Sequence, residues 1–141
     1  MHLGYDWLLD RHKLYLWQQF TNLFYPHLKD TTTLEPFYYE LLATAAKRFS
    51  KQNPKRVIIE SYIKLLEYEG RLHLEKRCYI CLQELGDNIA LMRGFLPAHK
   101  ECIFASDLNA QKVFTLLKTK KSIDLEEDEV DYLFSIVQKG L

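Results

Sequence analysis

The chain has 141 residues, 48% of them apolar and 27% charged, a composition typical of a soluble globular domain rather than of a disordered or fibrous chain. Its 19 basic and 19 acidic side chains cancel to a formal net charge of zero, so the overall charge gives no support for nucleic-acid binding. No apolar run approaches the roughly 20 residues that cross a bilayer, and the start lacks the pattern of a signal peptide. We expect a cytoplasmic protein with no membrane partner.

The first half of the chain predicts three helices. A buried helix is expected over 6–25, where apolar residues recur at helical spacing, namely Leu9, Leu16, Phe20 and Leu23. A second should follow the hydroxyl caps at 31–33, with Pro36 in its first turn and an inner face of Phe37, Leu41, Ala45 and Phe49. Asn53 and Gly70 should cap and stop a third, which begins at Pro54 and buries Ile58, Tyr62, Leu65 and Leu66.

The second half loses the helical period over 77–103 and then regains it. The Gly-Asp-Asn at 86–88 predicts a turn, and 89–95 predicts a short strand. A helix capped by Ser106 or Asp107 should then bury Leu108, Val113, Leu116 and Leu117, and a last helix should bury Val130, Leu133, Phe134 and Val137. The acids at 126–129 suit the first turn of that last helix; alternatively, they fold against a basic face.

These elements predict a mainly α fold, a small helical bundle that forms a single helical domain over 1–141. An insertion at about 77–103 should contain at most a short β-hairpin. No internal repeat or Gly/Ser linker divides the chain.

The insertion carries a pattern of metal ligands. Three cysteines cannot all pair within one chain, and Cys78 and Cys81 form a Cys-x-x-Cys. His99 and Cys102 repeat that spacing, so the four residues make a Cys3His zinc knuckle. A complete four-ligand shell leaves no open position for substrate, which favours a structural zinc and no enzymatic activity. The alternatives are that the cysteines are small buried apolar residues, or that the Cys-x-x-Cys is a redox pair.

Two groups of basic residues could contact nucleic-acid phosphates. The first spans the joint between the second and third helices, with Lys47, Arg48, Lys51, Lys55 and Arg56. The second precedes the knuckle, with Arg71, Lys76 and Arg77. Clustered positive charge is what a DNA backbone selects, although such runs are also common as solvated helix ends.

The residues from Phe37 to His73 read FYYELLATAAKRFSKQNPKRVIIESYIKLLEYEGRLH and precede the two ligand pairs. Together they resemble the C-terminal helical domain of the RecO family of recombination and DNA-repair proteins. The resemblance implies that Cys78, Cys81 and Cys102 match family cysteines, while His99 stands where another cysteine is usual. The family's N-terminal OB-fold has no counterpart here, because the chain opens on a helix; it looks like a C-terminal domain, a truncated gene product or a shortened form.

The resemblance also implies a function. RecO-like proteins bind single- and double-stranded DNA, anneal complementary strands, and act with RecR, often with RecF, to replace single-strand-binding protein by RecA. We therefore expect a DNA-repair mediator that neither makes nor breaks covalent bonds. The alternative is a protein-interaction module that binds RecR or the acidic tail of single-strand-binding protein without touching DNA.

Overall fold

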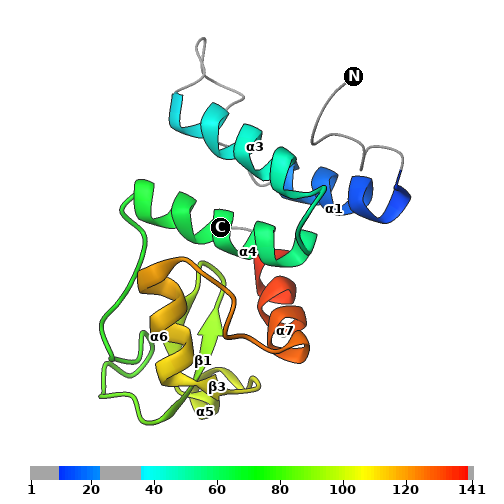
Figure 1. The fold of residues 1–141 in the computed structure, drawn as a ribbon. Coiled ribbons are helices and arrows are strands. Elements are labelled where there is room, and N and C mark those ends of the chain that lie inside the picture. The colour runs from blue at the N-terminus through cyan, green and yellow to red at the C-terminus, as the bar shows by residue number, and fades with distance from the viewer. Residues whose placement is uncertain (1–9, 23–35, 140–141) are drawn as a thin grey trace. The chain divides into compact units, whose positions relative to one another are not determined.

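The computed structural model describes residues 10–22 and 36–139 (Figure 1). Within these residues the chain is mainly α, as predicted, with six helices and a small antiparallel sheet. The chain divides into two compact units, Met1–Ser61 and Tyr62–Leu141, and the division falls inside helix α4 (Pro54–Tyr68). None of the helices in the described ranges is both long and apolar enough to cross a membrane.

The first unit contains α1 (Arg11–Asn22), α3 (Pro36–Arg48) and the start of α4. Asp10 caps α1, because its Oδ1 accepts the backbone N–H groups of the first turn at 2.9 and 3.2 Å. Leu16 and Phe20 are buried as predicted, whereas the expected start of this helix and its other apolar positions lie outside the described residues. The Trp17 ring packs edge-on against Phe20 and Phe49, with centroids 5.7 and 5.3 Å apart.

The predicted ends of α3 and α4 are largely confirmed. Pro36 begins α3, although the threonines expected to cap it lie outside the described residues. The inner face of α3 differs by one position, since Tyr38 is buried and Phe37 only half-buried. Asn53 caps α4 by accepting the N–H of Lys55 at 2.9 Å.

The second unit begins within α4, which ends where the sequence predicts. Gly70 follows it with a φ of +70°, the left-handed conformation that favours glycine. The N–H of Arg71 then reaches back to the carbonyl of Leu66 at 2.8 Å, which satisfies one of the helix's terminal carbonyls. The turn at Gly70 thus directs the chain out of α4 and toward the knuckle.

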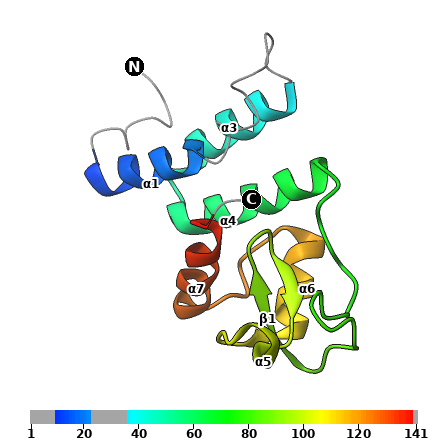
Figure 2. The ribbon, with the colours of Figure 1, turned by 180° about the vertical axis from the view of Figure 1, so that it is seen from behind.

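A three-stranded antiparallel sheet lies at the centre of the second unit, in the order β2–β1–β3. β1 (Asn88–Met92) and β2 (Leu96–Ala98) form the expected hairpin, with Ala90 opposite Ala98. β3 (Leu108–Asn109) pairs with the other edge of β1. Helix α6 (Ala110–Thr119) lies on one face of the sheet, as the two opposite views show (Figure 2). Ile89, Ala90 and Leu91 of β1 are buried.

The cap predicted for α6 is wrong. Leu108 lies in β3 and not in the helix, and the N-cap is Asn109, not Ser106 or Asp107. The side chain of Asn109 accepts the N–H of Lys112 at 3.1 Å, while the N–H of Ala110 donates to the carbonyl of Asp87 at 2.8 Å. Pairing with β1 therefore holds the chain extended for longer than local propensity indicates.

The last helix, α7 (Glu127–Val137), begins with the predicted acidic turn. Glu126 and Glu129 form a reciprocal capping box, and the N–H of Glu126 donates to Glu129 Oε1 at 2.9 Å. The predicted apolar face is buried, with Val130, Leu133, Phe134 and Val137 all at most 6% exposed. The acidic residues therefore act at the helix start, where negative charge suits the dipole.

Candidate metal centre and basic surfaces

The first ligand pair lies on a tight turn at 78–82. The N–H of Leu82 donates to the carbonyl of Cys78 at 2.9 Å, and the N–H of Cys78 donates to the carbonyl of Gln83 at 2.8 Å. A β-bridge between Arg77 and Glu84 closes the base of this turn. The backbone of the turn therefore positions Cys78 and Cys81 on a small rigid loop.

The second ligand pair follows β2. His99 occupies the N-cap position of the short helix α5 (Lys100–Ile103), and Cys102 lies on that helix. The N–H of Cys102 donates to the carbonyl of His99 at 3.0 Å. The two loops are tied together by the N–H of Tyr79, which donates to the carbonyl of Pro97 in β2 at 2.9 Å.

These two loops bring all four predicted ligands together. One ligand atom from each of Cys78, Cys81, His99 and Cys102 lies within 4.8 Å of the others, so the group could hold a metal ion. Cys81 is exposed and Cys102 partly so, which does not fit the alternative that the cysteines are simply buried apolar residues. Only Cys78 is fully buried.

The sulfur of Cys78 is surrounded by backbone donors. The N–H groups of Ile80, Cys81 and His99 point to its Sγ at 3.4, 3.5 and 3.4 Å. Burial opposes ionisation of this thiol, but the donated N–H groups outweigh burial and lower its pKa to about 6. The turn is thus built to hold a thiolate at this position.

His99 is oriented by its second ring nitrogen. Its Nε2 lies 3.0 Å from the carbonyl oxygen of Glu84, and a carbonyl can only accept, so Nε2 carries the hydrogen. The lone pair is then on Nδ1, which lies 3.3 Å from Cys81 Sγ and 3.8 Å from Cys102 Sγ. A ring fixed in this way by a backbone carbonyl is the usual arrangement of a metal-binding histidine.

Ionisation of the Cys102 thiol is unfavourable in the absence of a cation. Burial, followed by the hydrogen bonds and charges of Cys78 and Cys81, raises the pKa of Cys102 to about 11. A bound divalent ion would offset the repulsion among the sulfurs and allow all three to act as thiolate ligands. The donor set therefore fits a metal ion better than it fits three free thiols.

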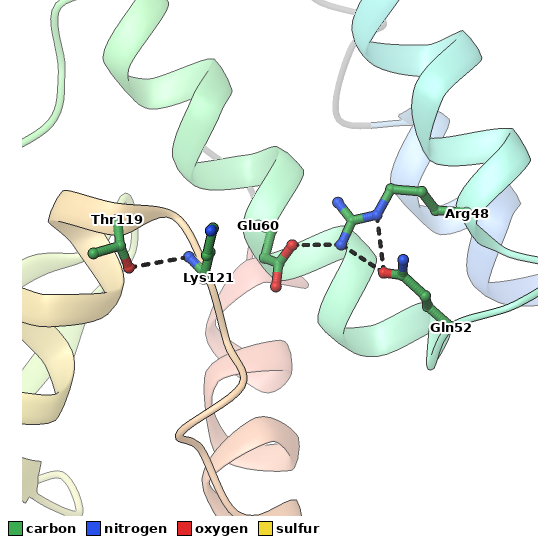
Figure 3. A network of polar contacts seen from close by, with 5 residues as sticks. All are labelled: Arg48, Gln52, Glu60, Thr119 and Lys121. Carbon is green, nitrogen blue, oxygen red and sulfur yellow. Dashed lines mark hydrogen bonds and ion pairs between the residues drawn. The ribbon is translucent and has the colours of Figure 1, made fainter.

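The basic residues of the first unit differ in exposure and in their polar partners. Lys47 and Lys51 are exposed. Arg48 donates to Glu60 Oε1 at 2.5 Å and also binds Gln52 Oε1 at 2.7 and 2.9 Å (Figure 3). Lys55 and Arg56 are half-buried. The guanidinium of Arg48 is thus engaged by a nearly buried carboxylate, which the charge pattern did not predict.

The remaining three predicted basic residues lie in the second unit. Arg71 is 3.5 Å from a carboxylate oxygen of Glu69. Lys76 and Arg77 are exposed, and the described residues provide neither with an ion-pair partner. Elsewhere in this unit Lys121 donates its backbone N–H to Thr119 Oγ1 at 3.3 Å (Figure 3), and Lys120 pairs with Glu67 at 2.8 Å. The two predicted clusters therefore belong to different compact units.

The exposed apolar side chains beside the ligands were not predicted from the sequence. Tyr79, Ile80 and Leu82 are 50%, 50% and 65% exposed, and Phe104, two residues after Cys102, is 92% exposed. The only sequence signal for them is that apolar residues fill positions within and next to the ligand pairs. Their burial could not be judged without the fold.

Comparison with known proteins gives no assignment. No protein-family description matches the chain, and no curated protein matches it.

Proposed function

We propose that the chain is a zinc-stabilised helical domain of a RecO-like DNA-repair and recombination mediator that binds DNA and carries out no catalysis. The supporting observation is a Cys3His group in a unit that also exposes Lys76 and Arg77, for which the described part of the chain provides no ion-pair partner. In this proposal the chain acts on single- and double-stranded DNA together with RecR and single-strand-binding protein, and only indirectly with RecF and RecA.

Zinc is the proposed metal because of the donor set. Zinc binds thiolate at about 2.3 Å and imidazole at about 2.0 Å, which places neighbouring sulfur and nitrogen ligands about 3.5 Å apart in a tetrahedron. The separations of His99 Nδ1 from Cys81 Sγ and Cys102 Sγ, 3.3 and 3.8 Å, lie on either side of that value. Four protein ligands would leave no position for a substrate, so the zinc would be structural.

The DNA contacts are assigned first to the free cations. Lys47 and Lys51 in the first unit, and Lys76 and Arg77 in the second, present unpaired positive charge within the described residues. Arg48 and Arg71 already face carboxylates, so they would contribute less. Lys55 and Arg56 are half-buried and have other interactions.

A charge reversal tests this assignment. The double variant Lys47→Glu/Lys51→Glu should bind a fluorescein-labelled single-stranded oligonucleotide at least about tenfold more weakly at low salt, measured by anisotropy. On single strands each phosphate contact contributes about 0.7 to the magnitude of the slope of log K against log[salt]. Loss of two contacts should therefore reduce the magnitude of this salt slope by about 1.4. Lys118→Glu/Lys121→Glu makes the same charge change at exposed positions outside the proposed surface and serves as the control.

The control decides the interpretation. An equal loss in both double variants would reduce the effect to net charge, and no detectable binding by the native chain at low salt would refute the DNA proposal.

A second candidate function is a protein-interaction module that binds RecR or the tail of single-strand-binding protein. The observation in its favour is the almost complete exposure of Phe104 and Ile123, at 92% and 83%. A titration with an acidic peptide that has an apolar end should show saturable binding that Phe104→Ala weakens and Lys47→Glu/Lys51→Glu leaves almost unchanged. Absence of saturation at millimolar peptide would remove this candidate.

A further inference from the structure

The metal-binding turn carries three apolar side chains that its own unit does not bury. Tyr79, Ile80 and Leu82 are half or more exposed. Cys78, which follows the bridge residue Arg77 and precedes Tyr79, is fully buried. Three exposed apolar side chains therefore stand close together in the sequence on one short turn, in a unit that also exposes Phe104 and Ile123. The turn therefore holds apolar groups out into solvent.

The backbone at Leu82 adds a second observation. Its φ is +66°, in the left-handed region where glycine is at ease and a large side chain is strained. A glycine there would relieve the strain and would remove an exposed apolar group at the same time. Strain of this kind occurs at ligand-binding turns, and Phe95, Phe104 and Lys120 share the conformation.

Tyr79 is held in a defined orientation. Its ring meets the ring of His73 edge-on, with centroids 5.8 Å apart and planes at 70°, and its N–H is bound to Pro97. Half of the side chain is nevertheless exposed. An anchored, half-exposed aromatic ring is what an unpaired nucleobase stacks on.

The charges and the pocket next to the turn indicate which partner fits. An open pocket of about 560 Å³ is lined by Glu75, Lys76, Arg77, Leu82, Gln83 and Glu84. Lys76 and Arg77 supply cations for phosphate. The amide of Gln83 can donate to and accept from the edge of a base, and the carboxylates can accept from it. A lining that is mostly polar and charged suits a base, with its flat apolar face and polar edge, better than it suits an apolar peptide anchor.

We propose that the zinc-binding turn is a single-strand-selective platform on which unpaired bases stack against Tyr79 and Leu82 while Lys76 and Arg77 hold the phosphates. This inference rests on the proposed DNA binding and names its substrate class as unpaired nucleobases. A duplex hides the faces of its bases, so the platform engages single strands and leaves duplexes to the other cations.

Replacing the ring provides the test. Tyr79→Ala should weaken binding to oligothymidine by about 5-fold to 150-fold, the range for loss of one base stack, and Tyr79→Phe should retain binding. Because stacking releases no counterions, the salt slope should not change, and affinity for a duplex of the same length should stay within about twofold. Zinc content equal to that of the native chain shows that the turn is intact.

Phe104→Ala is the matched control, an exposed aromatic ring of the same unit that lies outside the turn. An equal loss in this variant, or an equal loss on single strands and duplexes, overturns the platform. Full single-strand binding by Tyr79→Ala also overturns it. If only Lys47→Glu/Lys51→Glu loses binding, the proposed function stands without the platform; if only Tyr79→Ala does, the platform stands and the contacts assigned to the first unit fall.

Discussion

Chelation is expected to lower the melting temperature sharply and to release about one zinc ion per chain. Structural zinc contributes about 10–16 kcal/mol to the folding of zinc-finger peptides, comparable to the whole stability of a typical domain. Here the ligands come from two loops, which are joined by the hydrogen bond from the N–H of Tyr79 to the carbonyl of Pro97 and by the contact of His99 Nε2 with the carbonyl of Glu84. Circular dichroism during heating, with and without chelator, measures the change in melting temperature. Elemental analysis of the released metal measures the zinc content.

Two alanine variants distinguish the stability that the metal contributes from the stability that the hydrogen bonds to Cys78 contribute. Cys78→Ala and Cys81→Ala should each lose zinc, because each removes one of four ligands. In excess chelator, Cys81→Ala should melt like the native chain. Cys78→Ala should stay about 1–2 kcal/mol less stable, because three N–H groups lose the sulfur that accepts them.

One result would contradict the structural metal, and another would contradict the role of the N–H groups around Cys78. An unchanged melting curve in chelator, together with no zinc in the purified protein, would refute a structural metal. Identical behaviour of the two variants in chelator would mean that the N–H donors around Cys78 contribute no stability of their own.

Local signals in the sequence predicted much of the fold and the whole candidate metal site. Ligand spacing alone identified the four residues that the structure brings together, because the Cys-x-x-Cys and His-x-x-Cys spacings are local turns. Asn53 and Gly70 were likewise predicted from their own backbone preferences. Each ligand pair, and each of these helix ends, depends on residues only a few positions apart.

Features that depend on distant partners were missed. The cap of α6 shifts to Asn109 because Leu108 pairs with Ile89 in β1, a partner that the local pattern does not reveal. Arg48 was predicted as a DNA contact from charge alone, yet Glu60, which faces it, lies one helix further along the chain. Helical periodicity also cannot separate Phe37 from Tyr38, because neighbouring residues share much of a wide apolar face.

Replacing Tyr62 is expected to destabilise the second unit and to loosen the metal site with it. Tyr62 is fully buried on α4, its hydroxyl accepts the N–H of Gly94 at 3.0 Å, and its ring packs against Phe95 with centroids 4.8 Å apart. Tyr62→Phe should cost about 1–3 kcal/mol, because the buried N–H of Gly94 loses its acceptor. Tyr62→Ala should cost about 3–5 kcal/mol, because it also leaves a cavity.

The connection to the metal follows from the position of Gly94. It lies in the turn between β1 and β2, and β2 leads directly to His99, so the hydroxyl of Tyr62 fixes the hairpin that presents one ligand. Zinc should therefore transfer to a competing chelator faster from Tyr62→Phe than from the native chain. The control Tyr39→Phe, at a residue 64% exposed, should change neither the melting temperature nor the rate of zinc transfer. A lower melting temperature with an unchanged transfer rate would mean that Tyr62 stabilises the core alone and that the ligands are held by the two loops without help from α4.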